Sequence, residues 1–330
     1  MLALEDKWIW DFWFARDGAD WHVFFLQADK SLGDPDLRHW NVSIGHAVSS
    51  DLVNWTHLGA CFSPAPSPAW DDCTTWTGSV LQDEKGKWHL FYTGTCKAED
   101  GLKQRIGHAT SDDLHNWRRA ANNPVLDIDT ALYEELEKGR WHDRAFRDPH
   151  VIRDPAGGGW LMFFTARANG FAEPNAAGAI GLATSPDLEN WKLEPPVYAG
   201  GHFGQLEVPQ ALEIGGRWYC LFCTTPPYWS KDYAANYGRD PDGGTHYLVA
   251  DNPRGPWMLA SGEFLDGTAH SGRYSGKIIM TGSGPVYMAF ENTALDGSFI
   301  GRVCDPVPLA VLSDGALFLE EDTEKAASAS

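Results

Sequence analysis

The chain has 330 residues, of which 43% are hydrophobic and 13% are aromatic, and its formal net charge at pH 7 is −19. This excess of acidic residues argues against nucleic acid or an anionic membrane as a partner, because either would require a basic protein face. No apolar run of 18 residues is present, so the sequence predicts no membrane-spanning helix.

The N-terminal segment, MLALEDKWIWDFW, has no basic region followed by a long apolar stretch, so it does not read as a signal peptide. We therefore expect a cytoplasmic protein, with secretion left open if a leader has been removed. The six cysteines show no paired spacing of the zinc type and are expected to be reduced thiols. We see no cluster of metal ligands and expect no cofactor.

A phrase of about twelve residues recurs along the chain. It reads IGHAVSSDLVNW from residue 44, IGHATSDDLHNW from 106 and IGLATSPDLENW from 180, with a weaker YLVADNPRGPW from 247. An apolar run rich in aromatic residues precedes each phrase, and a fifth run has no phrase after it: 21–27, 88–94, 160–166, 218–224 and 285–290. Short runs of this composition, bounded by Gly or Asp, indicate β-strands.

Four strands recurring with a period of about 60 to 70 residues are typical of a β-propeller. We therefore predict an all-β fold, a five-bladed β-propeller of four-stranded antiparallel blades, spanning residues 1–320 as one domain. The blades are expected at about 8–60, 72–125, 144–197, 204–262 and 269–318. The phrase is interpreted as a turn made by its Ser and Asp, closed by a tryptophan that packs between blades: Trp55, Trp117, Trp191 and Trp257.

Two segments stand outside this repeat. Residues 129–139, DTALYEELEKG, have an Asp near the start and a Gly at the end, which predicts a helix between the second and third blades. Residues 321–330 are expected to be a disordered tail.

The innermost strand of each blade lines the central channel of a propeller. It is expected about ten residues before each apolar run, at 8–14, 76–81, 146–151, 205–210 and 274–279. Three of these segments carry a carboxylate at comparable offsets: Asp11, Asp148 and Glu207. Acids on otherwise apolar strands are unfavourable unless they are paired or functional. We predict that the three meet at one mouth of the channel; the alternative for a single acid is a salt bridge, such as Arg147 with Asp148.

A converging set of carboxylates points to glycoside chemistry. Two carboxyl groups about 5 Å apart suit retaining cleavage, and a wider pair suits inversion. Aromatic side chains would supply stacking surfaces for sugar rings, although each is equally suited to the core. The channel-facing candidates are Trp8, Trp13, Trp76, Trp141, Phe203, Tyr228 and Trp229.

Five motifs in order resemble glycoside hydrolase family 32, the group of invertases, inulinases and levanases. FRDPHV is similar to the family's Arg-Asp-Pro motif, and QLEVPQ is similar to its Glu-Cys-Pro motif with Val208 in place of Cys. WTGSVL resembles the Phe-Ser-Gly-Ser stretch, and IGHAVSSDLVNWTHL resembles the Gly-His-Ala phrase. Gln27 falls where the family has a substrate-contacting glutamine.

The resemblance implies catalytic roles for the three acids. Asp11 would be the nucleophile, Glu207 the general acid and base, and Asp148 the residue that holds sugar hydroxyls and stabilises the transition state. Arg147 would keep Asp148 ionised and in place. The first motif departs from the family's Asn-Asp-Pro-Asn-Gly, because here the acid stands in WIWDFWF. The candidates for contacting a disaccharide or oligosaccharide substrate are Trp10, Gln27, Trp76, Ser79, Arg147, Trp141, Phe203, Tyr228 and Tyr274.

Three functions remain open at this point. The first is a retaining hydrolase or transglycosidase acting on β-fructofuranosidic bonds. The second is an inverting enzyme of the arabinofuranosidase or xylosidase type, which also uses two Asp and one Glu on five blades. The third is a sugar-binding propeller without catalysis. We expect no C-terminal β-sandwich of the kind usual in the family, and we predict a homodimer that covers the exposed flank.

Overall fold

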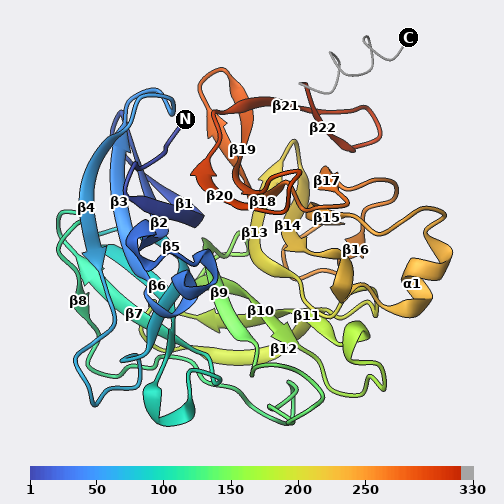
Figure 1. Ribbon diagram of the computed structural model, residues 1–330, viewed down its shortest axis with the longest axis horizontal. Coiled ribbons are helices and arrows are strands. Elements are labelled where there is room, and N and C mark those ends of the chain that lie inside the picture. The colour runs from blue at the N-terminus through green and yellow to red at the C-terminus, as the bar shows by residue number, and fades with distance from the viewer. Residues whose placement is uncertain (321–330) are drawn as a thin grey trace.

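The computed structural model describes residues 1–320, which form five antiparallel sheets arranged around a centre (Figure 1). The first sheet contains β1 (Lys7–Asp17), β2 (Asp20–Asp29), β3 (Ser43–Ser49) and β4 (Thr56–Phe62). The second contains β5 (Thr74–Gln82), β6 (Trp88–Thr95), β7 (Arg105–Ser111) and β8 (Arg118–Arg119). The third contains β9 (Phe146–Arg153), β10 (Trp160–Arg167), β11 (Gly178–Ser185) and β12 (Lys192–Tyr198).

The last two sheets each carry an extra short strand. The fourth runs β13 (Glu207–Ile214), β14 (Arg217–Thr224), β15 (Gly243–Ala250) and β16 (Met258–Leu259), with β17 (Asp266–Thr268) paired to β15. The fifth runs β18 (Arg273–Thr281), β19 (Gly284–Thr293), β21 (Val307–Val311) and β22 (Leu317–Leu319), with β20 (Phe299–Val303) paired to β19. The predicted five-bladed propeller is confirmed.

Helical structure in the described part of the chain is limited to short connecting pieces. One α-helix, α1, spans Lys231–Asn236, and the 3-10 turns are Lys30–Leu32, Pro35–Trp40, Lys97–Glu99, Pro174–Ala176 and Pro226–Tyr228. No helix among residues 1–320 is long and apolar enough to cross a membrane.

The predicted helix over 129–139 is wrong. The segment contains turns and isolated bridges, because its side chains are anchored separately on the third blade. Tyr133 is fully buried and its hydroxyl donates to the carbonyl oxygen of Glu194, while the Glu134 N–H donates to the carbonyl of Arg167. These tertiary contacts outweigh the local helix signals. The predicted disorder of 321–330 lies outside the described residues.

The recurring phrase forms the same turn in the first three blades. In the first, the Ser49 hydroxyl accepts the N–H groups of Asp51 and Leu52, and the Asp51 carboxylate accepts those of Val53 and Asn54. The leucine at its centre has a positive φ of 65°, 62° and 69° at Leu52, Leu114 and Leu188. The side-chain hydrogen bonds of Ser and Asp hold this otherwise disfavoured backbone, which explains why the phrase is repeated.

The predicted packing of the closing tryptophans between blades is confirmed for three of them. Trp117, Trp191 and Trp257 each make an edge contact with a phenylalanine of the preceding blade, at ring-centroid distances of 6.0, 5.3 and 6.2 Å. The partners are Phe24, Phe91 and Phe163, on β2, β6 and β10. Trp55 instead contacts Phe14 of its own blade at 6.2 Å.

The ring closes between the first and the last blade. The N-terminal residue Leu2 exchanges two backbone hydrogen bonds with Val303 of β20, at 3.1 and 2.9 Å. The innermost strands β1, β5, β9, β13 and β18 pack against their neighbours around the ring. Side chains from all five blades therefore face one central channel.

We predict that Trp257→Ala lowers the free energy of unfolding by about 3–5 kcal/mol, the usual effect of emptying a buried aromatic site. Trp257 is buried against Phe163, and its Nε1 donates to the Pro253 carbonyl at 3.0 Å. Its neighbour Met258 is exposed, so Met258→Ala is the matched control, expected within about 0.5 kcal/mol of the wild type. Urea denaturation measures both, and equal stability of the two variants would contradict the role between blades.

Candidate active site

Every innermost strand is interrupted at the same level of the channel. The pairing register shifts after Trp10, Trp76, Arg147, Glu207 and Tyr274, on β1, β5, β9, β13 and β18. The interruption leaves one residue unpaired on β1 and β5 and two on β9, β13 and β18, and it turns the first of them out of the regular alternation. Each blade therefore contributes two successive residues to this level of the channel, and seven of the ten line one cavity at its mouth.

These ten residues form two rings. The last paired residues form the outer ring of Trp10, Trp76, Arg147, Glu207 and Tyr274. The first unpaired residues form the inner ring of Asp11, Thr77, Asp148, Val208 and Ser275. Asp148, Val208 and Ser275 have φ values of 59°, 53° and 55°, in the left-handed region that residues other than Gly rarely adopt. Such backbone conformations gather at functional sites, where the surrounding structure maintains them.

The carboxylate of Asp11 is held by its two neighbours in the inner ring. The Thr77 hydroxyl donates to Oδ2 and the Ser275 hydroxyl donates to Oδ1, both at 2.6 Å. Asp11 is half-buried and lines a cavity of about 170 Å³ at the channel mouth. Its two oxygens are thus oriented by hydroxyls from the blades on either side while the group still faces the cavity.

Asp148 is buried on the opposite side of the inner ring. Its Oδ2 accepts hydrogen bonds from the Thr165 hydroxyl at 2.9 Å and from the Val208 N–H at 3.1 Å. Burial raises the pKa of Asp148 to about 7; the positive charge of Arg147 opposes this shift, and the negative charge of Asp11 adds to it. Arg147 thus favours the ionised form of Asp148, but burial outweighs its charge.

Arg147 is shared among several acids, which explains that outcome. One guanidinium nitrogen donates to Glu207 at 2.9 Å and another to Asp143 at 3.2 Å, while Nε lies 3.6 Å from Asp148. The pKa of Arg147 is raised by these acids in spite of its burial. A single buried cation thus links three carboxylates.

Glu207 belongs to the outer ring. In its strand it lies one position earlier than Asp11 and Asp148 lie in theirs. Three donors meet its carboxylate: the Tyr274 hydroxyl at 2.6 Å, Arg147 at 2.9 Å and the Gln205 amide at 2.8 Å. The predicted set of three acids is therefore brought together at one mouth, with Glu207 nearer the entrance than the other two.

Aromatic groups frame this cavity on two sides. Trp10 and Trp76 line it, and the Trp76 Nε1 donates to the His39 carbonyl at 2.9 Å. Trp141 and Tyr228 lie at the rim, with ring centroids 5.3 Å apart, and Tyr228 contacts the lining residue His142 at 5.9 Å. Burial raises the pKa of Tyr228, and the charge of Glu207 adds to this effect.

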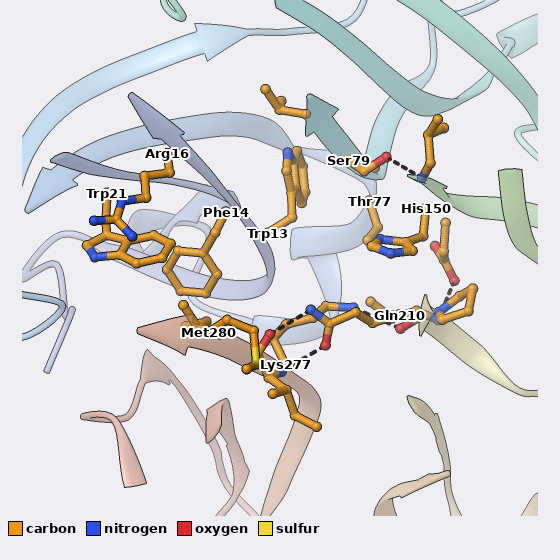
Figure 2. A pocket seen from close by; sticks show the side chains of 18 residues that line it. Trp13, Phe14, Arg16, Trp21, Thr77, Ser79, His150, Gln210, Lys277 and Met280 are labelled. Atoms are coloured by element: carbon orange, nitrogen blue, oxygen red, sulfur yellow. Dashed lines mark hydrogen bonds between the residues drawn. The ribbon is translucent and has the colours of Figure 1, made fainter. Parts of the chain in front are cut away.

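Six of the nine predicted substrate contacts are absent from the lining of this cavity: Gln27, Ser79, Trp141, Phe203, Tyr228 and Tyr274. Tyr274 donates a hydrogen bond to the lining residue Glu207, and Trp141 and Tyr228 contact the lining residue His142. Phe203 is fully buried among Phe222, Trp229 and Tyr233, so it has no surface to offer a sugar. Gln27 is buried behind β1 and donates to the Ser43 hydroxyl at 3.2 Å. Ser79 accepts the Val151 N–H and lines a separate cavity at the other end of the channel (Figure 2).

Several residues of the site were not predicted from the sequence. Thr77 and Ser275 occupy the same strand position as Asp11, so comparing the innermost strands column by column would have found them. Gln205 lies inside the predicted innermost strand 205–210, but nothing in the sequence around it indicates a role in the site. The remaining lining residues lie outside the innermost strands from which the site was predicted: Leu26, His39, Gln104, His142 and Asp143.

A protein-family model, described as the Glycosyl hydrolases family 32 N-terminal domain, matches residues 13–247. The matched range covers well over half of the chain and contains Asp148 and Glu207. It begins two residues after Asp11, where the first motif departs from the family pattern.

The chain also resembles characterised proteins. It is 25% identical to the extracellular sucrase of Zymomonas mobilis over 364 residues, which covers 96% of this chain and 82% of the sucrase. It is 26% identical to the invertase of Kluyveromyces lactis over 231 residues, which covers 64% of this chain. The matched part is 33% of that invertase, so the chain spans about a third of its length.

Among solved structures, the inulosucrase of Halalkalicoccus jeotgali bound to kestose matches with a TM-score of 0.80. The two proteins are 23% identical, and the match covers 96% of this chain and 87% of the inulosucrase. At this level of identity the likeness supports the fold alone.

We predict that Asp148→Asn becomes more stable relative to the wild type as pH rises. The folded protein keeps a proton on Asp148 up to a pKa of about 7, whereas the unfolded chain loses it near 3.8. The stability linked to this proton is therefore present below pH 4 and is lost as pH rises to 7, by about 4 kcal/mol. Urea denaturation of both proteins at pH 4.5, 6 and 8 measures the difference, and a constant or shrinking difference would exclude the raised pKa.

Proposed function

The chain belongs to glycosyl hydrolase family 32, and we propose that it cleaves β-fructofuranosidic bonds with retention of configuration. The observation that carries the proposal is the geometry around Asp11 and Glu207. Asp11 presents a carboxylate that is oriented by two hydroxyls and faces the cavity, while Glu207 stands nearer the entrance, fixed by three donors. Relatives named as a sucrase and an invertase support the same substrate class.

In the first step Asp11 attacks the anomeric carbon of the fructosyl unit. A bond forms between one Asp11 oxygen and that carbon, the bond to the leaving oxygen breaks, and Glu207 donates a proton to that oxygen. Thr77 and Ser275 limit the rotation of the attacking carboxylate. The carboxylate therefore loses little rotational freedom on reaching the transition state.

In the second step Glu207, now ionised, takes a proton from an acceptor hydroxyl. The acceptor oxygen attacks the anomeric carbon and the Asp11 carboxylate leaves, which restores both acids. Water as acceptor gives hydrolysis, and a sugar hydroxyl gives transfer. Arg147, Gln205 and Tyr274 keep Glu207 in one orientation through both steps.

Asp148 and Arg147 are proposed to hold the fructosyl unit itself. Asp148 lines the cavity beside Asp11, and its oxygens are of the type that accept sugar hydroxyls. Trp10 and Trp76 supply apolar faces near the nucleophile, and Trp141 and Tyr228 supply them at the rim. We propose that a disaccharide or oligosaccharide lies between these two aromatic groups, with the leaving group toward the rim.

The cytoplasmic location and the homodimer stay predictions from the sequence. All six cysteines are free thiols in the structure. The Zymomonas mobilis relative is named as extracellular.

The function is tested by incubating the protein with sucrose, 1-kestose and an aryl arabinofuranoside and measuring released monosaccharides. We expect turnover of the two fructosides, and a fall of about 10²- to 10⁴-fold in Glu207→Gln, because the general acid is lost. Glu213→Gln is the matched control, since Glu213 is exposed on the same strand β13 and should keep full activity.

Two outcomes would overturn the proposal. Turnover of the arabinofuranoside alone would assign the chain to a different sugar. Binding of the fructosides without any turnover would make it a sugar-binding propeller.

A further inference from the structure

A second cavity occupies the far end of the channel, behind the acidic site. Its volume is about 300 Å³, within the range of small-molecule sites. The innermost strands of all five blades contribute to its wall. It shares only Thr77 and Asp148 with the front cavity, which is the cavity at the channel mouth that Asp11 and Glu207 line. In Figure 2, Phe14 and Trp21 lie on one side of this rear cavity, and His150 and Gln210 lie on the other.

The rear cavity contains a buried cation with donors to spare. Lys277 is 5% exposed, and its ammonium group donates to the Val208 carbonyl oxygen at 2.9 Å. Among residues 1–320, no carboxylate oxygen lies within ion-pair distance of this ammonium group. An ammonium group has three N–H donors, and a buried one without a close anion is unusual in proteins. The Lys277 ammonium group could therefore donate to an anionic ligand in this cavity.

The surroundings of Lys277 show where such an anion would bind. Burial lowers the pKa of Lys277, and the charges of Cys223, Asp11, Asp148 and Cys220 oppose this shift and favour the ammonium form. Asp11 lines only the front cavity, whereas Asp148 lines both cavities and is already engaged by Thr165 and the Val208 N–H. Burial lowers the pKa of His150 to about 4, so this ring is neutral and adds no charge of either sign.

The remaining wall is largely apolar and aromatic. Trp13, Phe14, Trp21 and Met280 line the cavity together with Ile278 and Ile279. The buried Nε1 of Trp13 has no hydrogen-bond partner among the described residues. Arg16, at the same mouth, lies 4.7 Å from the centre of the Trp21 ring and donates to the Gly18 carbonyl. The wall thus offers donors and flat apolar surface, which suits a ligand with an acidic end and a flat apolar body.

We propose that the rear mouth of the channel is a second ligand site, which takes a small organic carboxylate. Its carboxylate pairs with Lys277, and its apolar body lies against Trp13, Phe14 and Met280. A carboxylate bound there neutralises a cation close to Asp11, which gives the site a route to lower turnover. That consequence rests on the proposed function, whereas the binding itself does not.

The test is a calorimetric titration of the full chain with sodium benzoate, with benzamide as the neutral ligand of the same shape. We expect one benzoate per chain, and at least about tenfold weaker binding of benzamide, because only the anion pairs with Lys277. Inorganic phosphate, which lacks an apolar body, is also expected to bind at least about tenfold more weakly.

Three variants locate the site. Lys277→Met removes the cation, and Met280→Trp fills the outer part of the cavity; each is expected to weaken benzoate binding at least about tenfold. Met280 is partly exposed at the rim, so this variant tests the site even if Lys277→Met fails to fold. Met258→Trp, an exposed methionine outside the cavity, is the matched control and should bind like the wild type.

The proposal is overturned if benzoate does not bind, or if it binds Met280→Trp as tightly as the wild type. Equal binding of phosphate would overturn the requirement for an apolar body. Because the titration measures no turnover, its failure would leave the proposed fructosidase activity untouched, and an inactive protein that binds benzoate would still support the site.

Discussion

The structure depends on one interruption in the pairing of each innermost strand. In a regular strand, successive side chains point to opposite faces, so only one of two neighbours could face the channel. A bulge at the same level in all five strands turns two successive side chains toward the centre. Contacts between neighbouring innermost strands bring these side chains together around the ring. Asp11 thereby reaches Thr77 of the second blade and Ser275 of the fifth, 264 residues away in sequence.

Charge at the channel is balanced by few cations. Asp11, Asp148 and Glu207 meet in a small space, with Arg147 between them on the front side and Lys277 behind. One consequence is that burial outweighs Arg147 at Asp148 and raises its pKa to about 7. Another is that the front and rear cavities share an electrostatic environment, although they open at opposite ends of the channel.

The sequence predicted the blades well because the repeated phrase has a local physical cause, a Ser- and Asp-stabilised turn followed by an aromatic contact. It also located the three acids, since the innermost strands lie at a similar distance before each apolar run. It could not predict the one-residue offset of Glu207, which depends on how each bulge forms. The expected helix over 129–139 and the expected sugar contact of Phe203 failed for the same reason, because tertiary burial of Tyr133 and Phe203 decided their positions.

The measurement that tests the central claim most directly is an NMR time course of the first product formed from sucrose. If Asp11 is the nucleophile held by Thr77 and Ser275, the first fructose to appear has the β-furanose configuration of the substrate, and Asp11→Asn forms none. The α-anomer appearing first would show direct attack by water. Asp11 would then act as a general base, and the account of a covalent intermediate would be contradicted.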